Sequence, residues 1–279
     1  MYKFGLIAKD IQNSVSPMIY ETLMPSIGEA CTYEIQNVPE EKLEETVEYA
    51  RSHWQGFNVT MPYKQMILPY MDEIDESAQQ CGSTNTVLVK DGNLIAYNTD
   101  GFGLIKAMQR VGFDFNGKKI VMLGAGGVAF SIAYNLSING VARVDVVNLF
   151  ENQTASLCKK FGSRFVPHPL DYKELAECCK GADLFINASV MGQIGYDEFA
   201  TFDFLDNLKP EAPVFDVNYS NPNALLVPTA RAKGHKAYVG SNMTACQAVR
   251  VMHIWTGREP TDEAIEELVN KFNAGGKKA

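Results

Sequence analysis

Short apolar stretches alternate along this chain with longer segments in which apolar residues recur every three or four positions. Short stretches of this kind predict strands, at residues 2–8, 32–37 and 56–59. The longer pattern predicts helices, one from Ser16 to about residue 24 with Pro17 in its first turn, and an acidic one over 40–52. Strands and helices in alternation predict an α/β fold with a largely parallel sheet.

A second alternation begins near residue 100. Before it, residues 84–89 and 93–97 predict a hairpin that turns at Asp91-Gly92. A helix is expected over 102–111 and another over 128–138. Further strands are expected at 119–123, 143–147, 184–187, 214–217 and 237–239. This series predicts a doubly wound, Rossmann-like domain.

Two predicted helices, 243–257 and 261–273, end the chain without a strand after them. We expect them to return to the first domain. The predicted organisation is therefore two α/β domains. Residues 1–100, completed by 241–279, form one, and residues 101–240 form the Rossmann-like one.

Composition narrows the possible functions. The 279 residues are 46% hydrophobic and 21% charged, as in ordinary globular proteins. The net charge of −8 disfavours nucleic-acid binding. The start of the chain does not resemble a signal peptide, and no apolar stretch approaches the ~20 residues that span a bilayer. We therefore expect a cytoplasmic protein without membrane contact. The scattered histidines and cysteines predict no metal site.

A glycine-rich turn follows the predicted strand 119–123. Residues Gly124-Ala125-Gly126-Gly127-Val128-Ala129 fit the pattern G-x-G-x-x-A between a strand and a helix. The first glycine permits a tight turn, the second allows a pyrophosphate to approach the backbone, and the helix N-terminus faces the anion. Such turns also occur for packing alone, but the strand–loop–helix context favours a dinucleotide site.

The end of the next strand bears on the choice between NAD and NADP. The sequence there is Asn148-Leu149-Phe150-Glu151. NADP sites usually place an arginine at this point and NAD sites a carboxylate. Neither stands at the strand end, and the nearest basic residues lie further along the next helix. The sequence predicts NAD or NADP, with a preference for NAD.

Three polar positions have both a structural and a catalytic interpretation. Ser14 and Ser16 flank a turn at a helix start, where hydroxyl and N–H groups cap the helix or hold a carboxylate. Lys64, taken alone, is an ordinary surface lysine, and Asp100 an ordinary helix cap. Together they form an ammonium–carboxylate pair able to shuttle the proton of an alcohol–ketone interconversion.

Read in order, these segments resemble the shikimate dehydrogenase family over nearly the whole chain. Eight segments carry the resemblance: Ser14-Val15-Ser16-Pro17, Asn58-Val59-Thr60-Met61-Pro62-Tyr63-Lys64, Ser83-Thr84-Asn85-Thr86, Asn98-Thr99-Asp100-Gly101, Gly124-Ala125-Gly126-Gly127, Asn187-Ala188-Ser189, Asp216-Val217-Asn218-Tyr219 and Met243-Thr244-Ala245-Cys246-Gln247. Each is common alone, but the ordered set is specific.

The resemblance implies reversible oxidation of a ring hydroxyl of shikimate by NAD or NADP, a step of aromatic amino acid and chorismate biosynthesis. It implies Lys64 as the acid/base group, oriented by Asp100. The implied substrate residues are Ser14, Ser16, Thr60, Asn85, Thr99, Tyr219 and Gln247. The implied cofactor residues are Gly124, Ala125, Gly126, Gly127, Val128, Asn148, Leu149, Asn187, Ala188, Ser189, Val217, Gly240 and Met243.

Departures from the family pattern keep alternatives open. Leu149 stands where NADP-using members generally carry arginine, and it resembles the NAD-using quinate/shikimate members. Glu21 replaces a usual asparagine. Quinate as main or second substrate is therefore an alternative, although two serines at 14 and 16 favour shikimate. A non-catalytic sensor and a folate-linked dehydrogenase are further alternatives, and a homodimer is possible.

Overall fold

A computed structural model describes residues 1–11 and 14–275 of the chain. Contacts between Cα atoms divide the chain into two compact units. The N-terminal unit contains residues 1–103 and 245–274, and the central unit contains residues 104–244. Within the described residues, no helix has the length and apolar character needed to cross a membrane.

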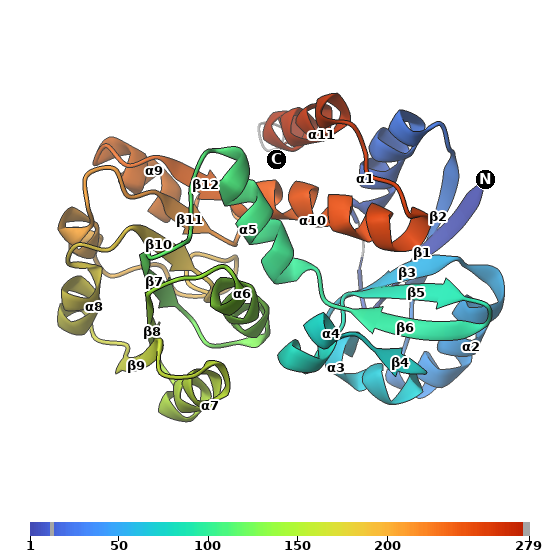
Figure 1. Ribbon diagram of the computed structural model, residues 1–279, viewed down its shortest axis with the longest axis horizontal. Coiled ribbons are helices and arrows are strands. Elements are labelled where there is room, and N and C mark those ends of the chain that lie inside the picture. The colour runs from blue at the N-terminus through green and yellow to red at the C-terminus, as the bar shows by residue number, and fades with distance from the viewer. Residues whose placement is uncertain (12–13, 276–279) are drawn as a thin grey trace. The chain divides into compact units, whose positions relative to one another are not determined.

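The N-terminal unit is built on a mixed six-stranded sheet in the order β2-β1-β3-β5-β6-β4 (Figure 1). Its strands are β1 Tyr2–Ala8, β2 Cys31–Asn37, β3 Gly56–Val59, β4 Glu73–Ile74, β5 Thr86–Lys90 and β6 Asn93–Tyr97. Strand β1 pairs in parallel with β2 and β3, while β5 is antiparallel to β3 and β6. The predicted hairpin is confirmed: Asp91 and Gly92 turn it with φ angles of 53° and 80°.

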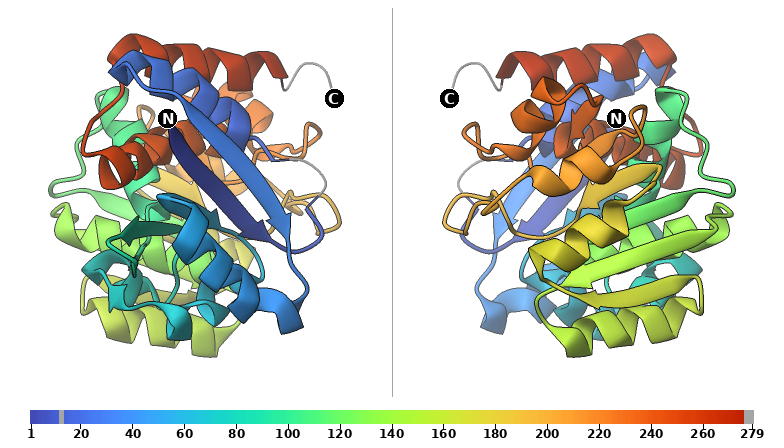
Figure 2. Two further views of the ribbon diagram at one scale, coloured as in Figure 1. Left: turned by 90° about the vertical axis from the view of Figure 1, so that its right-hand side faces the viewer. Right: turned by 90° about the vertical axis from the view of Figure 1, so that its left-hand side faces the viewer.

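Helices cover both faces of this sheet. They are α1 Ser16–Leu23, α2 Leu43–His53, α3 Tyr63–Met66, α4 Glu76–Cys81, α10 Gly240–Thr256 and α11 Asp262–Gly275. One core joins α2 and α3 to apolar residues of β1, β3 and β5. The other joins α1, α10 and α11 to Phe4, and α1 and α11 lie side by side there (Figure 2). Helix α11 corresponds to the helix predicted at 261–273, and residues 276–279 beyond it lie outside the described residues.

Trp255 of α10 anchors the end of the chain to this sheet. Its ring stacks on Phe4 with centroids 4.3 Å apart, and its Nε1 donates to the carbonyl of Val87 at 2.9 Å. A Cβ atom on Gly56 would lie 2.3 Å from the same indole ring. Glycine at this point of β3 therefore makes the room that the tryptophan fills.

The central unit has a six-stranded sheet in the order β12-β11-β10-β7-β8-β9, and all its pairs are parallel. Its strands are β7 Lys119–Leu123, β8 Arg143–Asn148, β9 Phe165–Pro169, β10 Leu184–Asn187, β11 Val214–Asp216 and β12 Ala237–Val239. The pattern analysis did not predict β9. Pro167 and Pro169 interrupt its strand signal, and it forms at the sheet edge, where proline is tolerated.

The helices of this unit are α5 Asp100–Arg110, which begins in the N-terminal unit, α6 Gly127–Ile138, α7 Glu151–Phe161, α8 Tyr172–Cys179 and α9 Leu226–Ala232. Apolar residues of α8 and α9 pack on one face of the sheet. Strand order reverses between β7 and β10, so the loops after Leu123 and Asn187 leave the sheet side by side. In doubly wound folds this reversal point is where ligands bind.

Candidate active site and dinucleotide loop

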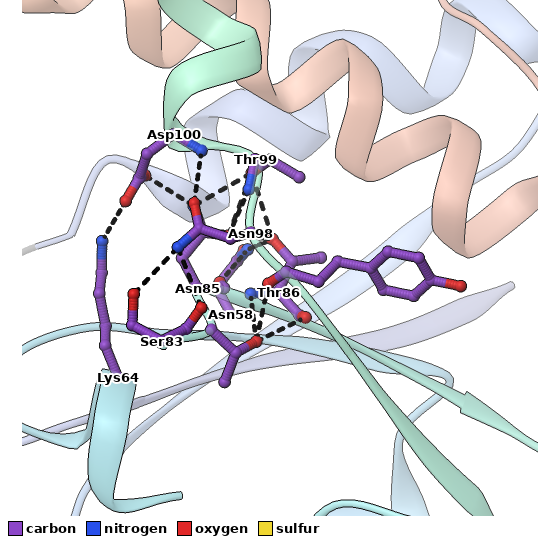
Figure 3. A network of polar contacts seen from close by, with 10 residues as sticks. Asn58, Lys64, Ser83, Asn85, Thr86, Asn98, Thr99 and Asp100 are labelled. Carbon is purple, nitrogen blue, oxygen red and sulfur yellow. Dashed lines mark hydrogen bonds and ion pairs between the residues drawn. The ribbon is translucent and has the colours of Figure 1, made fainter. Parts of the chain in front are cut away.

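Lys64 and Asp100 form an ion pair in the N-terminal unit (Figure 3). The Lys64 Nζ lies 2.7 Å from Asp100 Oδ2, and the two side chains are 30% and 10% exposed. Tyr63, beside Lys64, is fully buried and donates its hydroxyl to the carbonyl of Val38, which fixes α3 on the core. The ammonium is therefore presented by an anchored helix and remains reachable by a small molecule.

Asp100 is fixed by hydrogen bonds before any ligand binds. Its Oδ1 accepts from Asn85 Nδ2 at 2.7 Å, and its N–H donates to Asn98 Oδ1 at 3.2 Å. Helix α5 begins at Asp100, two residues before the predicted start at Phe102. The carboxylate therefore lies in the first helical turn, where the helix dipole favours negative charge.

Asn85 holds Asp100 and Thr99 together. Its Nδ2 donates to Thr99 Oγ1 at 3.0 Å as well as to Asp100, and its Oδ1 accepts from Thr99 N at 2.9 Å. Asn85 is 4% exposed and Thr99 is 1% exposed. Both hydrogens of the Asn85 amide are thus used within the protein, and these two residues brace the carboxylate from below.

Asn58 is a second residue whose side chain makes several hydrogen bonds, and no role was predicted for it from the sequence. Its Oδ1 accepts from the hydroxyls of Tyr20 and Tyr33 at 2.9 and 2.8 Å. Its Nδ2 donates to Asn85 O at 3.1 Å and to Thr86 Oγ1 at 3.4 Å. Every polar atom of the Asn58 side chain is therefore engaged. No role was predicted for Tyr20 and Tyr33, because only the packing of α1 and β2 against β3 brings their hydroxyls to Asn58.

This network reaches the predicted carboxylate-binding serines. Ser16 opens α1 and accepts from Ser14 Oγ at 3.1 Å, and its hydroxyl also bonds to that of Tyr33. Burial raises the pKa of Tyr33, which keeps this phenol neutral and able to donate to Asn58. A continuous series of hydrogen bonds thus connects the serine turn to the Asp100 carboxylate.

The remaining predicted substrate residues lie outside this network. Thr60 follows β3, where its N–H donates to Ile7 O at 3.1 Å, and its side chain is half-buried. Gln247 is half-buried on α10 in the N-terminal unit. Tyr219 belongs to the central unit, in the loop after β11, and is 47% exposed.

The glycine loop of the central unit has the features that a pyrophosphate site requires. Gly124 has φ of +110°, and a Cβ there would lie 2.5 Å from Ala188 O, so only glycine fits. At Gly126 and Gly127 an added Cβ would meet nothing within 4 Å. Gly126 caps α6 without a side-chain hydrogen bond, which leaves N–H groups of the first turn for an anion. Ala129 is fully buried, as close packing of helix on strand demands.

The loop after β10 borders this glycine loop. Ser189 N lies 2.8 Å from the position of a Cβ on Gly124, and Asn187 Oδ1 accepts from Ser189 Oγ at 2.6 Å. On the far side, a Cβ on Gly240 would lie 1.9 Å from Val217 O. The structure thus brings the predicted residues Gly124, Ala188 and Ser189 together, and pairs Val217 with Gly240.

The end of β8 presents an apolar surface. Leu149 and Phe150 are 64% and 55% exposed. Asn148 Nδ2 donates to Phe150 O at 3.0 Å and to Gln153 Oε1 at 3.3 Å, so this amide builds the turn into α7. Met243, by contrast, is buried in α10.

A cluster of Asp145, His168 and Cys178 was not foreseen, because its members come from β8, β9 and α8. Their potential ligand atoms lie within 4.8 Å of one another. Two cations already compensate the buried Asp145 carboxylate: Arg143 Nη2 lies 2.6 Å from Oδ1 and Lys119 Nζ 3.6 Å from Oδ2. These charges make the cluster a salt-bridge network and oppose a metal ion.

The fold and these groups together define a two-unit α/β protein with a dinucleotide-type loop in one unit and an ammonium–carboxylate pair in the other. Its residues 6–87 match the substrate binding domain of shikimate dehydrogenase, and residues 106–216 match shikimate/quinate 5-dehydrogenase. The chain belongs to the shikimate dehydrogenase family.

Individual relatives and solved structures agree with this family assignment. The chain is 32% identical over 271 residues to shikimate dehydrogenase (NADP(+)) of Alkaliphilus metalliredigens, covering 95% of each chain. It superposes with a TM-score of 0.87 and 28% identity on the Listeria monocytogenes shikimate 5-dehydrogenase solved with shikimate and NAD, covering 96% of each chain. The Thermus thermophilus enzyme solved with NADP(H) and shikimate gives 0.84 and 28%, covering 98% of this chain and 100% of that one.

Proposed function

We propose that the protein interconverts shikimate and 3-dehydroshikimate with a nicotinamide dinucleotide. The observation that carries this proposal is the ion pair between Lys64 Nζ and Asp100 Oδ2 at 2.7 Å. A proton-transferring group beside a carboxylate fixed by Asn85 suits an alcohol–ketone reaction. Relatives that cover nearly the whole chain support it, since they are named for this activity.

In this proposal Lys64 manages the proton at the reacting oxygen. During oxidation the neutral amine accepts the proton of the ring hydroxyl, and during reduction the ammonium returns it to the oxygen. Asp100 holds Nζ in position. A bound nicotinamide ring would accept or supply the hydride. Gly124 to Val128 and the N-terminus of α6 would hold its pyrophosphate, because Gly126 and Gly127 leave open space and the first turn of α6 offers N–H groups.

Substrate recognition is assigned to the remaining polar residues. Ser14, Ser16 and Tyr219 would hold the carboxylate, and Thr60 and Gln247 the ring hydroxyls. Asn85 and Thr99 would act mainly by bracing Asp100, because their hydrogen bonds are already made inside the protein. Quinate carries one more hydroxyl at the carboxylate-bearing carbon, and a site closed by two hydroxyl side chains favours shikimate over it.

Leu149 supports a preference for NAD, since an apolar side chain offers no partner for a 2′-phosphate. The names of the curated relatives do not favour this preference, because they specify NADP(+). The cofactor proposal at its general level, NAD or NADP, does not depend on this residue.

Steady-state kinetics with shikimate and quinate, each against NAD and NADP, test the proposal. We expect kcat/KM for shikimate to exceed that for quinate with either cofactor. Activity with neither acid would refute the function. A much higher kcat/KM with NADP than with NAD would refute only the NAD preference. A higher kcat/KM for quinate than for shikimate would refute only the substrate assignment.

A further inference from the structure

Asp216 is a buried carboxyl group beside the dinucleotide loop for which neither the reaction nor the resemblance provides a role. It ends β11 and is 2% exposed. Its Oδ1 accepts from Asn187 Nδ2 at 3.0 Å and from Asn218 N at 3.1 Å. Its hydrogen-bond donors are therefore a side-chain amide of β10 and a backbone N–H of its own loop, and among the described residues no cation forms an ion pair with it.

A short series of contacts leads from Asp216 to the glycine loop, all within the central unit. Asn187, held by Asp216, accepts from Ser189 N at 3.1 Å and from Ser189 Oγ at 2.6 Å. Asn218 donates to Ser189 O at 3.0 Å from the other side. Ser189 in turn packs against Gly124, whose added Cβ would lie 2.8 Å from Ser189 N. Asp216 thus fixes the segment against which the dinucleotide loop rests.

We propose that Asp216 is a positioning residue that holds this loop in its uncharged form, and that binding of the anionic dinucleotide takes up a proton from solvent at its carboxyl group. The inference rests on the proposed dinucleotide-dependent function. A neutral carboxylic acid with its proton on Oδ2 keeps Oδ1 as an acceptor. Both bonds at Oδ1 are therefore compatible with protonation, and no negative charge then faces the bound phosphates.

The electrostatic surroundings favour this protonation. Burial raises the pKa of Asp216 to about 7, against the opposing effect of the bonds from Asn218 and Asn187, and the Glu198 charge adds to the rise. Solvent at neutral pH can thus supply the proton.

The groups around Asp216 come from every element packed on β11. Strand β10 contributes Asn187, and β12 places Val239 opposite Asp216. The charged groups are Glu198, in the loop after β10, and Arg231 of α9, whose Nη2 donates to Ala237 O at 2.8 Å. The negative charge of Glu198 and that of a bound anion therefore both raise the pKa of Asp216.

The expected coupling follows from the strand register. Asp216 pairs with Asn187, and Asn187 pairs with Leu123 immediately before the glycine loop. Two strand spacings make this about 10 Å. At that distance, with an effective dielectric constant of about 20, repulsion by bound phosphate weakens dinucleotide affinity roughly tenfold once Asp216 ionises.

The test compares the affinities of the wild type and Asp216→Asn for NADH and for NADPH from pH 5.5 to 9, followed by nicotinamide fluorescence at low salt. The wild type should lose roughly tenfold in affinity as pH rises through 7, while Asp216→Asn stays near the low-pH value. The 2′-phosphate of NADPH titrates in the same way with both proteins, so its effect cancels when their affinities are compared. Asp183→Asn is the matched control, because it removes one charge before the opposite end of β10. It should follow the wild type.

Two further measurements sharpen the result. Calorimetry of NADPH binding in two buffers of different ionisation enthalpy should show proton uptake in the wild type at pH 7.5 and less in Asp216→Asn. Glu198→Gln should move the wild-type break to lower pH. Parallel pH profiles of the wild type and Asp216→Asn would overturn the inference and leave the function intact. Absence of NADPH and NADH binding at any pH would overturn both.

Discussion

The two functional regions of this protein are organised in opposite ways. Around Lys64 and Asp100, side chains hold side chains: the buried Asn85 and the half-buried Asn58 use their amides on neighbouring groups. Around Gly124, the backbone itself is the site, with open space over Gly126 and a close approach of Ala188. The difference teaches that the geometry of the proposed acid/base pair is set by donors and acceptors, whereas that of the proposed dinucleotide loop is set by the absence of side chains.

Removing the ammonium gives the largest expected effect. Lys64→Ala should lower kcat by ~10²–10⁴ because the general acid/base group is lost. Dinucleotide affinity should change far less than kcat, because the groups assigned to the pyrophosphate belong to the glycine loop. The control is Lys90→Ala, an exposed lysine at the end of β5. Near-normal turnover of Lys64→Ala with shikimate would disprove the proposed role.

Asp216 makes the stability of the central unit depend on pH. Its folded pKa of about 7 lies above the unfolded value of about 3.9. The folded state therefore binds the extra proton, and stability falls as pH rises from about 4 to about 7 and then stays level. Asp216→Asn removes this loss, which amounts to at most about 4 kcal/mol at pH 8. Urea unfolding at pH 5 and pH 8 measures it, and an equal difference between the proteins at both values would contradict it.

The glycine loop offers a matched pair of substitutions. Gly124→Ala places a Cβ 2.5 Å from Ala188 O at a φ of +110°, so we expect a loss of about 1–3 kcal/mol in unfolding free energy. Gly126→Ala meets no neighbour and should change that free energy by less than about 1 kcal/mol. Both should weaken NADPH binding. Thermal unfolding and fluorescence titration separate the two effects, and equal destabilisation would show that close approach is not what Gly124 provides.

Substitutions at Asn58 and its partners should have effects no larger than Gly124→Ala. Asn58→Ala deprives the hydroxyls of Tyr20 and Tyr33 of their acceptor, at a cost of about 1–3 kcal/mol in unfolding free energy, with lower kcat. Tyr33→Phe should cost about 1 kcal/mol. Tyr49→Phe, a surface tyrosine, is the control and should change stability by under about 0.5 kcal/mol. An unchanged kcat in Asn58→Ala would show that the hydrogen bonds of Asn58 stabilise the fold without affecting catalysis.

Sequence patterns predicted most of the architecture because apolar periodicity reports which faces are buried. They failed at β9, where Pro167 and Pro169 mask a strand that forms at the sheet edge. They singled out Lys64, Asp100 and Gly124 as candidates, since these stand in short ordered motifs, and the structure pairs Lys64 with Asp100. They could not show Tyr33 beside Ser16 or Asp216 beside Asn187, because such pairings arise from strand order and register. Glycine at 240 was expected near the cofactor, but its close contact with Val217 is visible only in three dimensions.

Trp255 has a consequence for the order of events during synthesis. It stacks on Phe4 and bonds to Val87, so the N-terminal unit lacks part of its core until α10 has left the ribosome. The central unit is continuous in sequence and has all its strands earlier. Domains generally fold as units as they emerge. We therefore expect the central unit to fold before the N-terminal unit, because residues 1–103 can complete their core only after Trp255 has been synthesised.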